Sequence, residues 1–336
     1  MIFLTDGWGF AMNMDMRRKL VFACVALVLI FAFVFSGLRI LESAGFLRQD
    51  EETTRKTKTV IRDGVAYFPR QDITVVLLMG IGKWGEVQPT EPNKSTPADM
   101  ITLLVFDEEA KKVNLLSLNR DTMVTMPELS KTGKQIGTIS QQLCLSHAYG
   151  TGLEDSCENT RTTVSDFLGK IRIDHYLSIT LDVISIMNDA VGGVTVNVTD
   201  DFSAVDPDIS MGEYTLRGNQ AVTFVQERRA LEDPLNISRM KRQEAFLSAF
   251  LPALRQTNSA SDTFSVKTYE KICPYIVSDC SMNALTGMMQ RYADYTIGEF
   301  LTPEGENVLG ETYYEFYADE EKLDDLILRL FYREKN

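Results

Sequence analysis

The chain has 336 residues, of which 44% are apolar and 24% are charged, so it can bury a substantial core as one large domain or two small ones. Its formal net charge is −13, which argues against a nucleic-acid binder, since such proteins normally present a basic face. The same negative charge disfavours docking on anionic lipid unless the chain carries a dedicated membrane anchor.

Residues 20–38 are predicted to be such an anchor. They read LVFACVALVLIFAFVFSGL, a run of about 19 uncharged residues that fits one membrane-spanning helix. Three basic residues precede the run, so the positive-inside rule places residues 1–19 in the cytoplasm and everything after the helix outside the cell. A cleaved signal peptide is the alternative, but its apolar core would be shorter and would end in small residues rather than in SGLR.

Residues 39–69 are rich in polar and charged side chains and are interpreted as a linker from the membrane to the domain. The remainder shows no internal repeat and no composition shift that would mark a boundary. Residues 70–335 are therefore expected to form one extracellular domain.

Three apolar runs in succession predict the centre of one β-sheet. They are DITVVLLMGIG at 72–82, MITLLVF at 100–106 and VNLLSL at 113–118, separated by a proline-containing loop and a charged turn. Each run is short enough to be a strand and too apolar to lie on a surface.

The rest of the chain alternates predicted helices and strands, which indicates an α/β fold with a mixed central sheet flanked by helices. Helices are expected at 138–149, 154–168, 182–190 (with Asp182 as N-cap), 220–229, 236–255 and 321–332. Further strands are expected at 175–181, 194–198, 297–301 and 312–317, and an acidic loop at 200–213.

Four cysteines lie after the predicted membrane helix, in a compartment that permits disulfides. Three pairings are possible, and the pairs Cys144–Cys157 and Cys273–Cys280 are predicted because short loops are the easiest to close. A zinc site is the alternative, but the chain lacks closely spaced cysteine pairs and has only two histidines.

Polar side chains follow the third apolar run as Asn119-Arg120-Asp121, where a buried strand should end, and Asp99 precedes the second run. Ligands of open α/β sheets bind at the ends of strands. Arginine offers a forked donor that suits phosphate, and aspartate can hold a divalent cation or accept a proton. The alternative is a surface ion pair that caps the strand.

A second polar cluster, QERRALEDPLNISRMKRQ at 226–243, gathers five basic residues in an otherwise acidic protein: Arg228, Arg229, Arg239, Lys241 and Arg242. Such a cluster could neutralise a diphosphate, although a solvated helix face paired with acidic neighbours is the alternative. Two carboxylates, several arginines and a divalent metal together would suit phosphoryl transfer.

In order along the chain, VVLLMGIG, ADMITLLVFD, VNLLSLNRDT, LSHAYGTG, IDHYLSITLD, VGGVTVNV, AVTFVQERR and NISRMKRQ resemble the extracellular LytR-CpsA-Psr family of Gram-positive bacteria, most specifically over residues 72–255. The resemblance implies a mixed sheet flanked by helices with an apolar pocket for a polyprenyl lipid. It also implies transfer of a glycopolymer from undecaprenyl diphosphate to a hydroxyl of peptidoglycan.

Carried over by position, the resemblance implies that Asp99, Arg120 and Asp121 are catalytic. Asp99 and Asp121 would hold Mg²⁺ or Mn²⁺, Arg120 would bind the diphosphate, and Asp121 or Asp99 would accept the proton. The remaining substrate-binding residues implied are Arg228, Arg239 and Gln243, with Arg229 as a substitute for a family arginine that this chain lacks.

Two departures from the family pattern bear on activity. The first arginine of the family's R-x-R motif is Gln226 here, and Gly82 stands where the family often has a second metal-binding aspartate. Losing one arginine and one carboxylate leaves the local charge nearly balanced. Three alternatives stay open: a diphosphate hydrolase, a non-catalytic binder of lipid-linked glycan, and a transcriptional regulator, against which the export topology argues.

Overall fold

The structure is a computed structural model that describes residues 59–130, 132, 134–228, 231, 236–261 and 263–334. All of these belong to one unit, Thr57–Asn336. The predicted membrane helix at 20–38 and the segment 1–19 lie outside the described residues. In the described part of the chain, no helix has the length and apolar character needed to cross a membrane.

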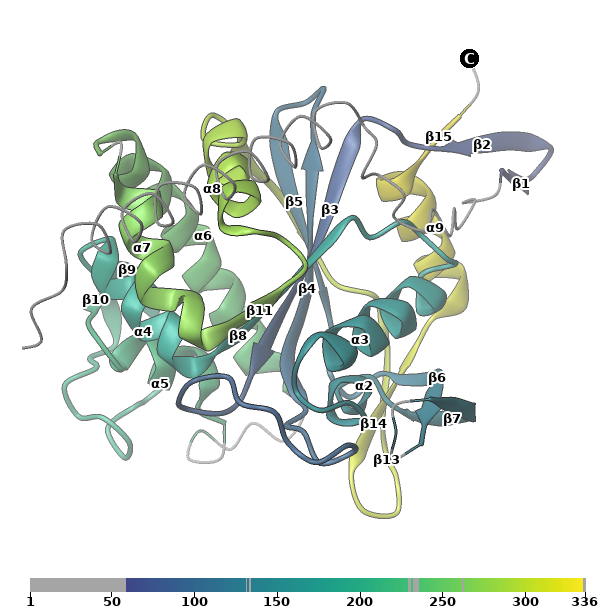
Figure 1. Cartoon of the computed structure of the whole chain (residues 1–336), viewed down its shortest axis with the longest axis horizontal. Helices are drawn as coiled ribbons and strands as arrows, with labels where there is room; N and C mark the ends of the chain where they lie inside the picture. Colours follow the sequence, from purple (N-terminus) through teal and green to yellow (C-terminus); the bar gives the residue numbers. More distant parts are fainter. Residues whose placement is uncertain are drawn as a thin grey trace, which may run out of the picture. The chain divides into compact units, whose positions relative to one another are not determined.

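A six-stranded mixed sheet forms the centre of the domain (Figure 1). In spatial order its strands are β11 (Ile276–Ser278), β8 (His175–Thr180), β3 (Ile73–Ile81), β4 (Ala98–Asp107), β5 (Lys112–Leu118) and β12 (Thr296–Leu301). The pairs β3–β4 and β4–β5 are antiparallel, whereas β8 runs parallel to β3 and β12 parallel to β5. The three apolar runs are thus adjacent central strands, as predicted.

Smaller sheets surround the central one. β9 (Val194–Val198) pairs with β10 (Gly212–Leu216), β6 (Met123–Leu129) with β7 (Gln135–Gln142), and β13 (Gly305–Leu309) with β14 (Tyr314–Ala318). A fourth small sheet joins β1 (Val60–Arg62), β2 (Val65–Pro69) and the C-terminal β15 (Tyr332–Glu334). Strands β1 and β2 thus lie within the C-terminal end of the stretch 39–69 that is predicted to be a linker.

Helices cover both faces of the central sheet. One face carries α3 (Glu154–Phe167) and α9 (Glu320–Phe331), which pack into the main core, with the short α2 (Leu145–Ala148) beside them. The helices over the other face are α4 (Leu181–Ala190), α5 (Gln220–Gln226), α6 (Ile237–Ser259), α7 (Phe264–Ile272) and α8 (Met282–Arg291). A 3₁₀ turn, Cys273–Tyr275, links α7 to β11.

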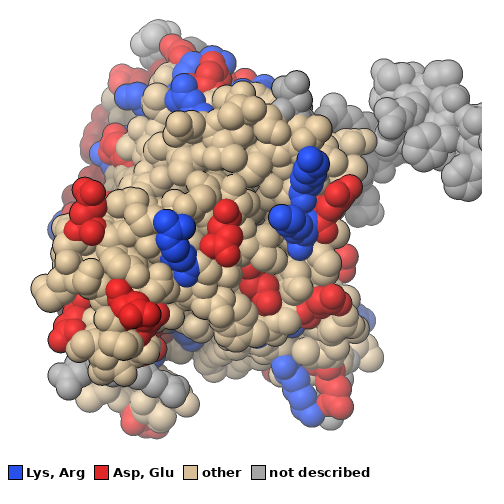
Figure 2. Space-filling model, turned by 90° about the vertical axis from the view of Figure 1, so that its left-hand side faces the viewer, with Lys and Arg blue, Asp and Glu red and all other residues tan. Residues whose placement is uncertain are grey.

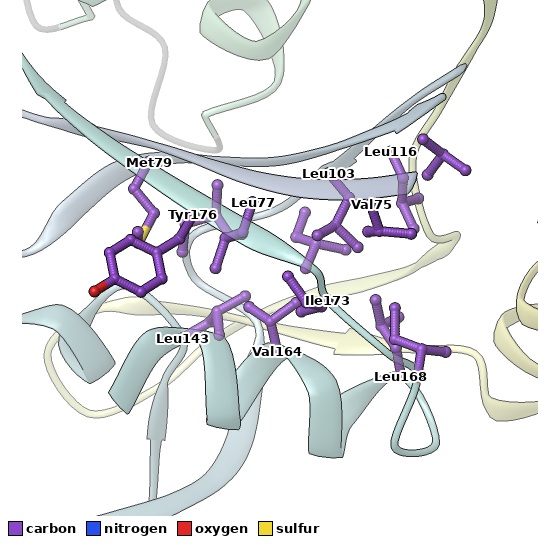
Figure 3. Packing of buried hydrophobic residues seen from close by; sticks show 14 of the residues in the cluster. Val75, Leu77, Met79, Leu103, Leu116, Leu143, Val164, Leu168, Ile173 and Tyr176 are labelled. Atoms are coloured by element: carbon purple, nitrogen blue, oxygen red, sulfur yellow. The ribbon is translucent and has the colours of Figure 1, made fainter. Parts of the chain in front are cut away.

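The alternation of side chains along β3 separates the two faces of the sheet. Val75, Leu77 and Met79 are at most 1% exposed and point toward Val164 and other apolar side chains of the α3 layer (Figure 3). Burying a leucine of this kind stabilises the fold by roughly 1.5–3 kcal/mol. The intervening residues of β3 face the other helical layer.

Several predicted elements differ from the structure. The helix expected at 138–149 is wrong over its first half, because 135–142 pairs with β6 as strand β7 and only Leu145–Ala148 is helical. Thr180, not Asp182, is the N-cap of α4. The Asp182 carboxylate instead accepts a hydrogen bond of 2.7 Å from the Gly85 backbone N–H. The helices at 154–168, 236–255 and 321–332 are confirmed to within a few residues.

Charges of both signs are interspersed on the side of the molecule that carries helices α4 to α8 (Figure 2). No continuous basic patch appears in that view, where a nucleic-acid binder would concentrate lysine and arginine.

Candidate functional site

Asp99 lies in a β-bulge at the N-terminal end of β4, a central strand of the sheet. Gly80 pairs with Met100 and Ile81 pairs with Ala98, so Asp99 is the extra residue of β4 and has no partner on β3. A bulge bends its strand and redirects the side chain that it carries. Because β4 is antiparallel to β3 and β5, both neighbours finish beside its N-terminal end, and the bulge brings Asp99 beside the segment that follows β5.

A hydrogen-bonded turn after β5 positions Arg120 and Asp121. The Asn119 side chain accepts a hydrogen bond of 3.1 Å from the Asp121 backbone N–H, and Thr122 Oγ1 donates to the Asn119 carbonyl at 2.6 Å. Asparagine and threonine favour such local turns because their side chains bond the neighbouring backbone. The turn is buried, so the two charged side chains leave it in fixed directions.

Three predicted site residues meet at one carboxylate oxygen. Arg120 Nη1 forms a hydrogen-bonded ion pair with Asp99 Oδ1, and Arg239 Nη1 lies 3.7 Å from the same oxygen. The Arg239 side chain is 5% exposed and that of Arg120 is 20% exposed. These residues are far apart in the sequence, so the fold itself builds the cluster.

Asp121 and Arg228 complete this cluster. Arg120 Nε lies 3.4 Å from Asp121 Oδ1, and the same oxygen accepts a hydrogen bond of 3.3 Å from the side chain of Gln142. Arg228 lies close enough for its charge to act on both Asp121 and Arg239. The structure therefore brings together Asp99, Arg120, Asp121, Arg228 and Arg239, and Arg229 lies outside the described residues.

Burial and neighbouring charges shift the ionisation of the cluster. Desolvation raises the pKa of Asp121 despite the adjacent arginines Arg120, Arg228 and Arg239. Burial also lowers the pKa of Arg239 to about 10, aided by Arg120 and Arg228, while Asp99 opposes the shift. Arg239 thus stays charged at neutral pH, and Asp121 is a weaker acid than an exposed aspartate, which suits a proton acceptor.

Arg242 has a structural role that its place in the basic cluster did not reveal. It lies one helical turn after Arg239 and is 4% exposed. Its Nε donates to the Phe224 carbonyl at 2.8 Å, and its other nitrogens bond the Glu227 carbonyl and Asp200. Arg242 therefore ties α6 to the end of α5 and positions the segment that carries Arg228.

A large apolar cavity opens beside the charged cluster. It has a volume of about 740 Å³ and lies between the central sheet and the helices α4, α6, α7 and α8. Val76, Leu78 and Gly80, the residues of β3 that alternate with its core side chains, line the cavity. Its polar lining includes Asp99, Gln226, Arg239 and Gln243, whose Nε2 donates to the Val225 carbonyl at 3.3 Å.

Gly82 and Gln226, the two departures from the family pattern, are neighbours in space. A Cβ atom added to Gly82 would lie 2.0 Å from Asp99 Oδ2 and 3.8 Å from Gln226 Nε2. Both positions therefore border the same carboxylate.

The donor atoms do not fit a preformed site for a divalent cation. One oxygen of Asp99 is taken up by Arg120 and Arg239, and Oδ1 of Asp121 is engaged by Arg120 and Gln142. Neither carboxylate belongs to a set of three potential ligands. Within the described ranges, the one such set of His, Cys, Asp or Glu is His175, Asp279 and Cys280. Magnesium or manganese at Asp99 and Asp121 stays a prediction.

All four cysteines that were predicted to form disulfides are free in the structure, so the structure does not bear out the pairs Cys144–Cys157 and Cys273–Cys280. Cys144 Sγ accepts a hydrogen bond of 3.1 Å from Arg120 Nη2. Cys157 lies in the main core near Ser178, and Cys273 is exposed and faces the Glu270 carbonyl at 3.4 Å. A short separation in sequence does not place two thiols together, because the helices and turns that carry these cysteines point their side chains in different directions.

The C-terminal part of the chain supplies contacts to the site that the sequence did not indicate. The Phe316 backbone N–H donates to the Asp121 carbonyl at 2.9 Å, and Gln142 Nε2 donates to the Tyr314 carbonyl at 2.8 Å. Strand β14 thus supports both Asp121 and the amide that bonds its carboxylate. Only the strand pattern of 312–317 signalled this segment, and it did not show its partner.

Two known proteins with similar sequences share one name. A teichoic acid transferase of Bacillus licheniformis, named "Polyisoprenyl-teichoic acid--peptidoglycan teichoic acid transferase TagU", is 23% identical over 321 residues, 94% of this chain and 95% of its own length. An Enterococcus faecalis protein of the same name is 30% identical over 57% of each chain.

Solved structures show the same fold. B. subtilis TagV matches with a TM-score of 0.60 at 23% identity, covering 78% of this chain and 96% of its own. TagT bound to LI-WTA matches with a TM-score of 0.58 at 21% identity, covering 77% and 90%. The family model described as "LytR_cpsA_psr family" matches residues 39–330, so this chain belongs to the LytR-CpsA-Psr family.

Proposed function

We propose that this protein transfers a glycopolymer from a polyprenyl diphosphate carrier to peptidoglycan by phosphoryl transfer. The observation that carries the proposal is the junction of an apolar cavity of about 740 Å³ with a buried cluster of arginines and carboxylates. Such a junction matches a molecule with a long hydrocarbon chain and a diphosphate head.

The cavity provides a binding site for the prenyl chain. Its walls are mainly aliphatic and aromatic side chains from the sheet and the helices, and the cluster residues Asp99 and Arg239 lie in its lining. Burying apolar surface stabilises the bound chain by roughly 25 cal/mol per Å². The diphosphate then lies against Arg120, Arg228 and Arg239, whose guanidinium groups can donate paired hydrogen bonds to its oxygens.

In the proposed reaction, the hydroxyl oxygen of a peptidoglycan sugar attacks the phosphorus that bears the glycopolymer. A new P–O bond forms, the P–O bond of the diphosphate anhydride breaks, and polyprenyl phosphate leaves. Asp121 takes the hydroxyl proton, since its raised pKa makes it a better acceptor than an exposed aspartate. The arginines stabilise the charge that moves to the leaving phosphate.

The relatives support this assignment. The names of TagU and TagV relatives state a polyisoprenyl-linked teichoic acid and peptidoglycan as the two reactants. A reaction of the same class at this site would attach a glycopolymer, whose identity the site does not specify, to the cell wall.

The reaction also requires a place outside the membrane, and we propose that residues 20–38 anchor the chain with its C-terminal domain extracellular. The charge pattern of the sequence supports this orientation. Reporter fusions at the C-terminus test this orientation. A reporter enzyme that is active only outside the cytoplasm is expected to be active. A fusion active only in the cytoplasm would contradict it and revive the regulator hypothesis.

A direct test of function is the transfer of a labelled lipid-linked glycan to peptidoglycan fragments by the purified full chain. Arg120→Ala should lower the rate by about 10²–10³-fold, because it removes a charge that stabilises the transition state. Arg291→Ala, a matched change in an exposed ion pair with Glu108, should leave the rate unchanged. Release of free glycan phosphate without transfer would instead identify a hydrolase, and binding without turnover would identify a non-catalytic binder.

A further inference from the structure

The ion pairs of Asp99 raise a question about the metal that the family pattern implies. Oδ1 of this carboxylate already lies between Arg120 and Arg239, and Oδ2 faces the empty position above Gly82. A cation at Asp99 would therefore approach two guanidinium groups at short range with one free carboxylate oxygen as its protein ligand. Mg²⁺ prefers hard oxygen ligands and is repelled by such charges.

The balance of charge in the cluster points the same way. Arg120, Arg228 and Arg239 are positive, and Asp99 and Asp121 are at most two negative charges, so the cluster keeps an excess of positive charge. This excess offsets part of the two negative charges of a diphosphate diester, and it does so without a cation. An aspartate at position 82 would cancel the excess, and a cation would then be needed to hold the diphosphate.

We propose that this site binds the diphosphate of its lipid substrate through Arg120, Arg228 and Arg239 without a divalent cation, and that Gly82 is the residue that makes the cation unnecessary. This rests on the proposed function for the identity of the substrate. It does not rest on turnover, because the claim concerns how the diphosphate is held.

The local geometry gives Gly82 this role. A Cβ atom at position 82 would lie 2.0 Å from Asp99 Oδ2, so any larger residue there must displace the Asp99 carboxylate from its present place. An aspartate would set a second carboxylate against the first, and two carboxylates at that distance favour a shared cation or a shared proton. The amide of Gln226, 3.8 Å from the same point, adds no charge.

The test uses two probes with the full chain in detergent. Binding of geranylgeranyl diphosphate is measured by calorimetry in EDTA and in millimolar MgCl₂, and binding of Mn²⁺ alone is measured by electron paramagnetic resonance. We expect the two dissociation constants of the lipid to agree within about twofold and no stoichiometric Mn²⁺ binding by the protein alone. A lipid affinity that falls about tenfold or more in EDTA, or one tightly bound Mn²⁺ that Asp99→Asn abolishes, would overturn the proposal.

Gly82→Asp should create the metal dependence that the natural chain lacks. In EDTA its affinity for geranylgeranyl diphosphate should fall about tenfold or more, because a new negative charge faces the diphosphate, and Mg²⁺ should restore it. Gly82→Ala is the matched control: it sets the same Cβ atom against Asp99 but adds no charge, so its affinity should be the same in EDTA and in Mg²⁺. Equal metal dependence of both variants would contradict the proposal.

A second variant protects the test from misfolding. Gln226→Glu has the same shape as the natural residue and also adds a carboxylate beside Gly82, so it should gain the same metal dependence without a steric clash. If wild type binds no geranylgeranyl diphosphate in any buffer, the proposed function fails. The Mn²⁺ measurement on the two carboxylate variants then still decides whether Gly82 controls a cation site.

Discussion

The two faces of the central sheet are made from the same strands and have opposite uses. On one face of β3, Val75, Leu77 and Met79 belong to the core that packs against α3 and are at most 1% exposed. On the other, Val76, Leu78 and Gly80 line a cavity of about 740 Å³. Both sets of residues are apolar or small, so composition does not distinguish them. The difference lies in the helices opposite: α3 and α9 approach the sheet closely, whereas α4, α6, α7 and α8 enclose a space.

One apolar strand thus packs into the core on one face and lines a cavity on the other. Protein interiors are normally close-packed, and a cavity costs free energy because its lining loses contacts. The packed face supplies stability that the hollow face forgoes. The hollow face is therefore the part of the fold that has room for the proposed lipid.

Adjacent leucines of β3 provide the sharpest test of the two faces. Leu77→Ala should lower the free energy of unfolding by about 2–5 kcal/mol, because it opens a cavity in a packed core. Leu78→Ala should cost less than about 1.5 kcal/mol, since this side chain already faces open space. Urea denaturation of both variants measures the difference. Equal losses would show that the second face is packed as tightly as the first.

The polar end of the cavity can be tested at Asp121. Asp121→Asn should lower the transfer rate by about 10²-fold or more, because an amide cannot accept the proton. Burial raises the pKa of Asp121 in the folded state, so folding favours its protonated form, and that contribution is lost as pH rises through the folded pKa. Relative to wild type, the variant should therefore gain stability at pH 7 and lose this advantage toward pH 4.

Thermal unfolding of Asp121→Asn and wild type across that pH range checks the sign. The isosteric change keeps the volume of the buried side chain, and Asp121→Ala serves as the comparison that also removes atoms. A variant that is less stable than wild type at pH 7 and recovers at low pH would mean that the arginines, not burial, dominate at this carboxylate.

Filling the cavity should separate binding from stability. Leu177 lies on β8 and lines the cavity, so Leu177→Trp should weaken binding of geranylgeranyl diphosphate by about tenfold or more while changing the melting temperature little. The binding calorimetry described above measures the affinity. Unchanged affinity would place the hydrocarbon chain elsewhere, and a large loss of stability would show that the space is already filled by neighbouring side chains.

The smallest effect is expected at the sheet edge, away from both faces. His175 Nδ1 lies 3.5 Å from Asp279 Oδ2, which raises the pKa of His175. The hydrogen bond to His175 helps lower the pKa of Asp279, although burial opposes it. The histidine contribution is complete below its ordinary value of 6.5 and is lost as pH rises through the raised value. The aspartate contribution is complete above 3.8 and is lost as pH falls through the lowered value.

Stability from this pair should therefore be greatest between these two values and decline toward pH 8. Because the His175 side chain is 39% exposed, solvent screening limits the change to less than about 1 kcal/mol. Asp279→Asn should flatten the decline between pH 6 and 8, as measured by urea denaturation. A decline of equal size in the variant would assign it to other groups.

The sequence predicts the central sheet well and its surroundings less well. β3, β4 and β5 are long apolar runs whose strand character does not depend on distant partners. The helix predicted at 138–149 overlaps β7, whose polar residues carry no strong strand signal, and only the pairing of β7 with β6 makes it a strand. Pairings between segments far apart in the sequence, such as β2 with β15, left no local trace.

For the site, the sequence predicts which residues take part but not the directions in which their side chains point. Arg239 and Arg242 belong to the same basic cluster in the sequence, yet Arg239 pairs with Asp99, whereas Arg242 bonds two backbone carbonyls and Asp200. The side-chain direction depends on what packs against α6. The support of Asp121 by Phe316 likewise depends on a long-range contact that no motif records.

The proposed function requires a polyprenyl diphosphate that lies with its chain in the cavity and its head at the arginines. Mass spectrometry of lipid that copurifies with the detergent-extracted full chain tests this directly. We predict polyprenyl phosphates or diphosphates with wild type, and a clear loss of them with both Leu177→Trp and Arg120→Ala. Prenyl lipids that are absent from wild type, or that are retained equally by both variants, would contradict the account.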